Sequence, residues 1–143
     1  ELRASYVTLH RLGKLRGCIG TVRARLPLVE DVAEHAYESA FLDSRFPPLR
    51  QRELDGLDIR VSVLGPCQPL DVSCERDLLE QLRPGKDGLL LKCGMHVATF
   101  LPSVWEKAPD PRDFLRHLKR KAGLDPVRWD EETRFYRYTT DEF

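Results

Sequence analysis

The residues with the clearest chemical potential are Arg16 and Cys18, in the segment 15–20, Leu-Arg-Gly-Cys-Ile-Gly. Alternate residues of a strand share a face, so this spacing predicts that Arg16, Cys18 and Gly20 point to the same side. A neighbouring cation favours the thiolate, which is the form of cysteine that acts as a nucleophile. The glycines at 17 and 20 would let another backbone or a ligand approach closely. The segment therefore predicts a ligand-binding site made by Arg16, Gly17 and Gly20, with Cys18 as the candidate catalytic residue.

The same segment also fits a plain structural interpretation. Free cysteine is among the most buried residue types, so Cys18 could be a small buried thiol, with Arg16 directed to solvent. The residues alone favour this second interpretation. No histidine adjoins Cys18 in the sequence, and His10 could either face it across a hairpin or lie on the surface.

Three further charged residues are candidates for binding a small anionic ligand. Arg45 precedes Phe-Pro-Pro and could bind a carboxylate or phosphate with two hydrogen bonds, or cap the helix before it. Asp87 could position a ligand, although a plain turn at 87–88 is favoured. Lys121 belongs to a basic helix, and a solvated helix face is the commoner role of such a charge cluster.

The composition restricts the class of protein. The 143 residues suit one domain, 1–143, which needs neither a metal nor a disulfide to fold. Lys plus Arg equals Asp plus Glu at 23 each, which makes nucleic acid an unfavoured partner. No apolar run approaches the about 20 residues of a membrane-spanning helix, and no signal peptide is visible. Four cysteines without zinc spacing predict free thiols in the cytoplasm and no metal site; the sequence indicates no particular cofactor.

The apolar periodicity predicts an α+β fold with two hairpins. Strands are expected at 5–10 and 15–19, at 57–63, at 89–92 and 96–101, and at 134–138. A first helix should run from Pro27 to about Leu42. Its apolar stripe comprises Val29, Val32, Ala33, Ala36 and Ala40.

Two later helices are also expected. The second helix follows a cap at Ser73. The third begins with Asp110 as cap and Pro111 at its first position, and ends at Gly123. Its buried residues should be Phe114, Leu115, Leu118 and Ala122.

Several motifs in combination resemble the AMMECR family, and most closely its bacterial form in AmmeMemoRadiSam systems, known there as protein A. Members of that form usually carry helical residues before the first strand, so we expect natural residues to precede Glu1. The matching segments cover nearly the whole chain: residues 15–20, 43–49 (Asp-Ser-Arg-Phe-Pro-Pro-Leu), 61–64, 82–88, 98–102, 121–123 and 137–138.

The resemblance implies a fold and a pathway but no established reaction. It implies a duplicated unit of three strands and two helices around one antiparallel or mixed, barrel-like sheet, with a cleft lined by the Cys18 segment. It also implies Memo-like and radical S-adenosylmethionine proteins as partners. We therefore expect a ligand-binding or catalytic cleft centred on Cys18 and Arg16; an enzyme of this kind would act on a small anionic or carbonyl substrate. A non-catalytic interaction or small-molecule-binding module is the alternative, and RNA binding is less favoured.

Overall fold

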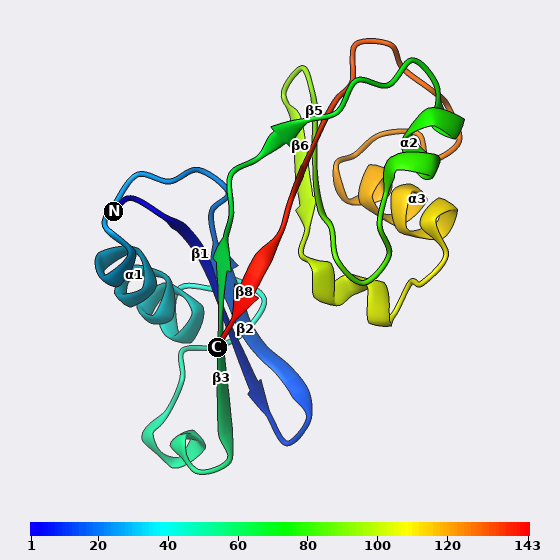
Figure 1. Ribbon diagram of the computed structural model, residues 1–143. Coiled ribbons are helices and arrows are strands. Elements are labelled where there is room, and N and C mark those ends of the chain that lie inside the picture. The colour runs from blue at the N-terminus through cyan, green and yellow to red at the C-terminus, as the bar shows by residue number, and fades with distance from the viewer. The chain divides into compact units, whose positions relative to one another are not determined.

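The computed structural model describes residues 1–143, which divide into two units, Glu1–Gly65 with Asp141–Phe143 and Pro66–Thr140 (Figure 1). The predicted α+β class is confirmed, with three α-helices and two antiparallel four-stranded sheets. The expectation of one barrel-like sheet is wrong. The strands pair in two separate sheets, in the orders β2-β1-β3-β8 and β4-β7-β5-β6, and neither sheet closes on itself.

The first unit is built on a hairpin and a third strand. Strand β1 (Ala4–Arg11) pairs antiparallel with β2 (Lys14–Gly20) on one side and with β3 (Leu57–Leu64) on the other. Helix α1 (Leu28–Phe41) and the short 3-10 helix η1 (Gln51–Leu54) lie between β2 and β3 in the chain. Strand β8 (Thr140–Glu142) adds to the free side of β3.

A β-bulge interrupts β2 at Arg16. Leu9 stands opposite Gly17, but the next residue, His10, stands opposite Leu15, so that Arg16 is the extra residue of β2. A bulge of this kind re-aims side chains and breaks the alternation of faces. A shared face for Arg16 and Cys18 therefore stays a prediction, and the hydrogen-bond partners of Arg16 lie in the segment after α1.

Helix α1 presents both apolar and polar residues to its sheet. Of the predicted apolar stripe, Val32, Ala36 and Ala40 pack in the core, whereas Ala33 is exposed. Asp31, His35 and Ser39 are buried, whereas Val29 is 77% exposed. One cause is the contact with β2: the Ser39 hydroxyl donates to the Val7 carbonyl (2.8 Å) and accepts from the Ile19 N–H (2.9 Å). A side chain that bridges the β1–β2 ladder fixes the rotation of the helix.

The second unit contains the remaining elements, and the predicted second hairpin and last strand are confirmed. They are β4 (Gln68–Pro69), α2 (Glu75–Gln81), β5 (Gly88–Cys93), β6 (His96–Phe100), the 3-10 helix η2 (Pro102–Glu106), α3 (Pro111–Lys121) and β7 (Arg134–Tyr138). The ends of α3 follow the sequence signals. The Asp110 side chain accepts a hydrogen bond from the Arg112 N–H (2.8 Å), and Gly123 adopts φ 82° just after the helix.

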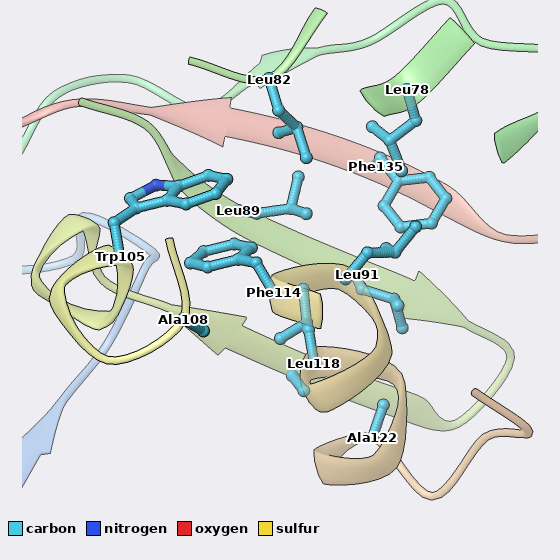
Figure 2. Packing of buried hydrophobic residues seen from close by; sticks show 12 residues of the cluster. Leu78, Leu82, Leu89, Leu91, Trp105, Ala108, Phe114, Leu118, Ala122 and Phe135 are labelled. Carbon is cyan, nitrogen blue, oxygen red and sulfur yellow. The ribbon is translucent and has the colours of Figure 1, made fainter. Parts of the chain in front are cut away.

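The core of the second unit is large and apolar (Figure 2). Trp105 and Phe114 stack with ring centroids 3.8 Å apart, and Leu89 and Leu91 of β5 lie beside them. All four predicted buried residues of α3 are confirmed as part of this cluster. No helix of either unit is long and apolar enough to pass through a bilayer.

The two units repeat one arrangement of hairpin, helix and third strand. In both sheets the first hairpin strand lies in the middle, between its hairpin partner and the third strand, in the orders β2-β1-β3 and β6-β5-β7. The closing pairs of the hairpins, Arg11 with Lys14 and Cys93 with His96, align the two repeats. Counting back along the first strand from these pairs makes Leu9 equivalent to Leu91 and Thr8 equivalent to Leu90. Cys18 stands opposite Thr8 and Thr99 stands opposite Leu90, so Cys18 is equivalent to Thr99.

Candidate functional site

Cys18 lies half-buried on β2, the edge strand of the first sheet, with its thiol on the face opposite α1. Its neighbour Gly17 faces the helix, because a Cβ added to Gly17 would overlap the Ser39 carbonyl of α1. Directly across β1, the Thr8 hydroxyl lies 3.2 Å from the Cys18 sulfur. The thiol is therefore hydrogen-bonded, but it is not sealed inside packed side chains.

The cation next to Cys18 is Arg45, which the loop after α1 delivers. Arg45 binds Asp43 with two hydrogen bonds (Nε to Oδ1 3.0 Å, Nη2 to Oδ2 2.7 Å), and its Nη2 also donates to the Cys18 carbonyl (3.4 Å). The Cys18 N–H in turn donates to Asp43 (3.1 Å). These bonds, that from Arg45 above all, hold the pKa of the Asp43 carboxyl well below its usual range and raise that of Arg45.

The two side chains of the Asp43–Arg45 ion pair differ in burial. The side chain of Asp43 is 6% exposed, whereas that of Arg45 is 55% exposed. Asp43 therefore fastens β2 to the end of α1, and part of the Arg45 guanidinium is left open to a ligand. Arg45 was predicted to bind a ligand or to cap a helix; its observed bonds are to a carboxylate and to an edge-strand carbonyl.

Arg16 is bound elsewhere. Its guanidinium donates to Glu53 of η1 (2.8 and 3.2 Å) and to the Pro47 carbonyl (2.7 Å), and the residue is only 9% exposed. The hydrogen bond from Arg16 is the main cause that lowers the pKa of Glu53 to about 2, and the same bond raises the pKa of Arg16. Arg16 thus fastens the loop after α1 to the bulge of β2.

Phe46 links the two ion pairs. The Cζ atoms of Arg16 and Arg45 lie 5.8 and 5.4 Å from the centroid of its ring, within cation–π distance. Reasoning from the sequence did not select Phe46, Asp43 or Glu53 as members of the site. A signal was present for two of them, because Asp43 and Phe46 belong to the same matched segment as Arg45.

The glycines of the segment have packing partners. Gly17 meets the backbone of α1 at Ser39, which is the close backbone approach that the sequence suggested. A Cβ on Gly20 would overlap the Tyr6 ring and the Ser5 carbonyl. A ligand contact by either glycine stays a prediction.

Asp87 and Lys121 belong to the second unit, where each has partners of its own. Asp87 is fully buried and accepts three hydrogen bonds from Arg83, including one from its backbone N–H. Its carbonyl accepts from the Trp105 ring N–H (2.7 Å). Lys121 donates to the Thr99 carbonyl (2.9 Å), with its Nζ 5.1 Å from the centroid of the Phe100 ring. Ligand binding by these two residues also stays a prediction.

A buried cluster of Ser5, Asp31 and His35 has the residue types of a hydrolase triad without its geometry. The Ser5 hydroxyl lies 2.6 Å from Asp31 Oδ2 and 3.3 Å from His35 Nδ1, and Asp31 Oδ2 lies 3.1 Å from the same nitrogen. A triad needs serine and aspartate on opposite ring nitrogens. All three residues are at most 4% exposed, so the cluster joins α1 to β1 rather than meeting a substrate.

Metal ligands do not converge in the structure. No group of three or more His, Cys, Asp or Glu side chains is arranged to hold a metal ion. All four cysteines carry free thiols; Cys67 and Cys93 lie in the second unit, as does the exposed Cys74. Burial raises the pKa of the Cys67 thiol, which lowers its reactivity. Cys18 is thus the one thiol of the first unit.

The fold and the Cys18 segment define an α+β protein with two antiparallel sheets and a thiol on an edge strand. The chain belongs to the AMMECR1 family, whose model matches residues 1–143. It is 41% identical to a protein of Methanothermobacter thermautotrophicus, over the whole chain and 76% of that protein. It is 37% identical to a protein of Methanocaldococcus jannaschii, over the whole chain and 73% of that protein. The crystal structure of an uncharacterized protein from Pyrococcus horikoshii is similar with a TM-score of 0.93 and 36% identity, covering 99% of this chain and 73% of that one.

Proposed function

We propose that the chain binds a small anionic or carbonyl compound in a cleft at Cys18, and that the Cys18 thiol acts on it as a nucleophile. The observation that carries the proposal is the environment of the thiol: it is half-buried and hydrogen-bonded to Thr8, beside an arginine that is more than half exposed. The Thr8 hydroxyl holds the sulfur in place, and a partly open guanidinium suits a carboxylate or phosphate. Arg16 supports this site by holding the loop that carries Phe46 and Arg45.

The pathway assigned to this site comes from the family resemblance. We propose that residues 1–143 act as one AMMECR-like domain in the cytoplasm. Its partners would be a Memo-like protein and a radical S-adenosylmethionine protein, as in AmmeMemoRadiSam systems. The family match supports the domain assignment, whereas the relatives described above are archaeal proteins whose names state no activity.

A non-catalytic binding module is the second candidate, and one observation favours it. Both guanidinium groups near β2 are already neutralised, Arg45 by Asp43 and Arg16 by Glu53. A cation that is neutralised by a carboxylate activates a thiol less than a free cation does. In this case Cys18 would shape the cleft without forming a covalent bond.

Alkylation of Cys18 separates these two functions. We expect iodoacetamide to modify Cys18 faster than it modifies glutathione below about pH 8, because an activated thiol ionises earlier than the ordinary value of about 8.5. The modified peptide is quantified by mass spectrometry, with the exposed Cys74 of the same chain as an internal reference. If Cys18 reacts no faster than glutathione, the nucleophile function is wrong.

Retention of small molecules from a cell extract then tests the binding module. Cys18→Ser keeps the size of the side chain and removes the nucleophile. A module of this kind retains the same compound with serine at this position, whereas a covalent enzyme loses its turnover. Arg45→Gln removes the open guanidinium, so it should weaken retention in either case.

A further inference from the structure

The face of the first sheet opposite α1 brings together a thiol, an imidazole and a carboxylate from three neighbouring strands. Cys18 of β2 stands directly opposite Thr8 of β1. His10 lies two residues further along β1, whose register with β3 is unbroken, so it shares the face of Thr8. Asp58 of β3 stands directly opposite His10. Residues directly opposite each other project to the same face, so Cys18, His10 and Asp58 form a diagonal across β2, β1 and β3.

The bulge at Arg16 changes what lies between the thiol and the imidazole. In an uninterrupted ladder Arg16 would stand opposite His10 on this face. The bulge makes the half-exposed Leu15 the partner of His10, and Arg16 turns to Glu53 and the Pro47 carbonyl. The bulge thus places an apolar side chain, and not a cation, directly opposite His10 on β2.

In this cluster of Cys18, His10 and Asp58, one buried nitrogen of the His10 ring makes no hydrogen bond. Thr8 holds the Cys18 sulfur at 3.2 Å, and Arg60, opposite Thr8 on β3, donates to Asp58 (3.3 Å). The Nδ1 atom of His10 is buried and has no hydrogen-bond partner. A buried polar atom without a partner needs an explanation, and a catalytic role is one of the recognised explanations.

We infer that His10 is the proton-transfer group for Cys18, that Asp58 orients the imidazolium ring and that Thr8 positions the thiol. The inference rests on the proposed function, because it concerns the chemistry of the same thiol. Diagonal neighbours across an antiparallel pair are about 7–8 Å apart at Cα, within reach of side chains such as histidine. Catalytic hydrogen bonds are often long before substrate binds and tighten in the complex.

The step that this arrangement supports is addition of the thiol to a carbonyl group. His10 takes the proton of the Cys18 thiol, and the sulfur forms a bond to the carbonyl carbon. The π electron pair moves to the carbonyl oxygen, which receives the proton back from the imidazolium. The product is a hemithioacetal or hemithioketal, with no oxidant, reductant or leaving group required. The half-exposed Arg45 assigns a carboxylate to the same substrate, so the substrate class is a small carbonyl acid.

Alkylation of Cys18 across the pH range tests the role of His10. Wild type, His10→Gln, Asp58→Asn and Thr8→Val are treated with iodoacetamide between about pH 5 and pH 9, which spans the ordinary titration of histidine and cysteine. We expect the rate for His10→Gln near neutral pH to fall about tenfold, since general bases typically contribute at least this much. Asp58→Asn should have a smaller effect, because it acts only through the ring.

The controls keep structural damage apart from chemistry. His117→Gln removes an exposed histidine of α3, and Asp55→Asn an exposed acid before β3; neither should change the rate. Circular dichroism checks that each variant is folded. If the His10→Gln protein is unfolded, the ring titration of His10 is followed by NMR in wild type and in Cys18→Ser. A curve that is unchanged by loss of the thiol overturns the inference.

The remaining outcomes are distinguishable from failure of the proposed function. A reactive Cys18 whose pH profile is the same in wild type and His10→Gln overturns the role of His10 alone. A Cys18 that reacts no faster than glutathione in wild type overturns the nucleophile function and the inference with it. A rate that falls equally in His10→Gln and in His117→Gln shows a general effect of the substitution and also overturns the inference.

Discussion

The two units differ in how polar the contact between helix and sheet is, although they share one order of strands. Helix α3 packs on β5 and β6 through Phe114, Leu115 and Leu118, which are completely buried. Helix α1 packs on β1 and β2 through polar groups, Asp31, His35 and Ser39, with Val7, Leu9 and Ala40 as the buried apolar cluster. Apolar contacts tolerate small shifts, whereas hydrogen bonds fix distance and direction. The repeat with the polar interface is also the one that carries the candidate site.

The edge strands show the same contrast at equivalent positions. Cys18 and Thr99 each offer a carbonyl to a cation from the end of the packed helix or just after it: Arg45 at 3.4 Å and Lys121 at 2.9 Å. In the second unit the Thr99 hydroxyl donates to the Leu89 carbonyl (2.9 Å) and lies 2.8 Å from the Tyr138 hydroxyl. The Thr99 hydroxyl is therefore already hydrogen-bonded inside its own unit. The Cys18 thiol meets only Thr8 at hydrogen-bonding distance. Two of the predicted ligand-binding residues, Arg45 and Lys121, are therefore structural counterparts.

The strongest test of this comparison is Gly17→Ala. A Cβ at this position would overlap the Ser39 carbonyl, and the backbone of a helix held by hydrogen bonds cannot move away easily. Overpacking of this kind costs about 3 kcal/mol, measured as the loss in free energy of unfolding by urea. Cys18 alkylation should also change, because β2 would shift.

Ala98→Gly is the matched control for that substitution. Ala98 stands opposite Leu91, as Gly17 stands opposite Leu9, and it carries the Cβ that Gly17 lacks. Removing this Cβ should cost about 1 kcal/mol, from backbone freedom and one lost methyl group. If Gly17→Ala is no more destabilising than Ala98→Gly, the close contact of α1 with β2 is not a determinant of this fold.

Acid should weaken the first unit before the second. The pKa of Glu53 falls from its ordinary value of 4.5 to about 2 in the folded protein, chiefly because Arg16 donates hydrogen bonds to it. A carboxyl whose pKa is lower when folded stabilises the protein above its unfolded pKa, and this stability is lost as pH falls toward the folded value. The lowered pKa of Asp43 acts in the same direction. The urea midpoint of wild type should therefore fall between pH 6 and pH 3.

Glu53→Gln provides the control for acid sensitivity. The glutamine cannot ionise, so this variant should start with a lower midpoint at pH 6 and lose less of it by pH 3. Amide hydrogen exchange locates the effect, and protection should decrease first in β2 and η1 and later in α3. An equal midpoint loss in wild type and Glu53→Gln would mean that the Arg16–Glu53 pair does not set the acid sensitivity.

The second unit was the more predictable from sequence, and the reason is physical. The boundaries of α3 depend on local signals, the cap at Asp110, the proline at 111 and the glycine at 123, and its buried residues follow the helical period. The face that α1 buries depends on partners far away in the chain, since Ser39 bonds to Val7 and Ile19. A hydrophobic pattern does not report such bonds, so the apolar stripe predicted the core contacts of Val32, Ala36 and Ala40 but not the buried polar residues beside them.

The sequence indicated several residues of the candidate site, but not which residues they bind in the fold. The period of two grouped Arg16 with Cys18, but it reports neither the bulge at Arg16 nor the bond of Arg16 to Glu53, 37 residues away. Arg45 was selected from a matched segment, and its contact with the Cys18 carbonyl required the fold. The barrel-like sheet implied by the resemblance could not be tested by periodicity, which reports faces of strands and not the closure of a sheet.

The smallest expected effect compares the two hairpin turns. Leu12 has φ 54° and is 76% exposed, and Gly13 follows with φ 77°. A two-residue turn with two positive φ angles favours Asn-Gly, and a leucine in this conformation costs about 1 kcal/mol. The second hairpin has Gly94 at the equivalent position, with φ 59°. Leu12→Asn should therefore raise the free energy of unfolding by about 1 kcal/mol.

Met95→Asn is the control for the turn, because Met95 is 97% exposed and does not have a positive φ. Both substitutions replace an exposed apolar side chain with asparagine, but only Leu12 has a positive φ. A gain in Leu12→Asn that is absent in Met95→Asn assigns the effect to the turn. A loss in Leu12→Asn would instead mean that the leucine side chain stabilises the hairpin, most directly against Gly56, whose built Cβ lies 3.9 Å from Leu12 Cδ2. In that case the positive φ is maintained by a side-chain contact that the second hairpin, with glycine at this position, cannot make.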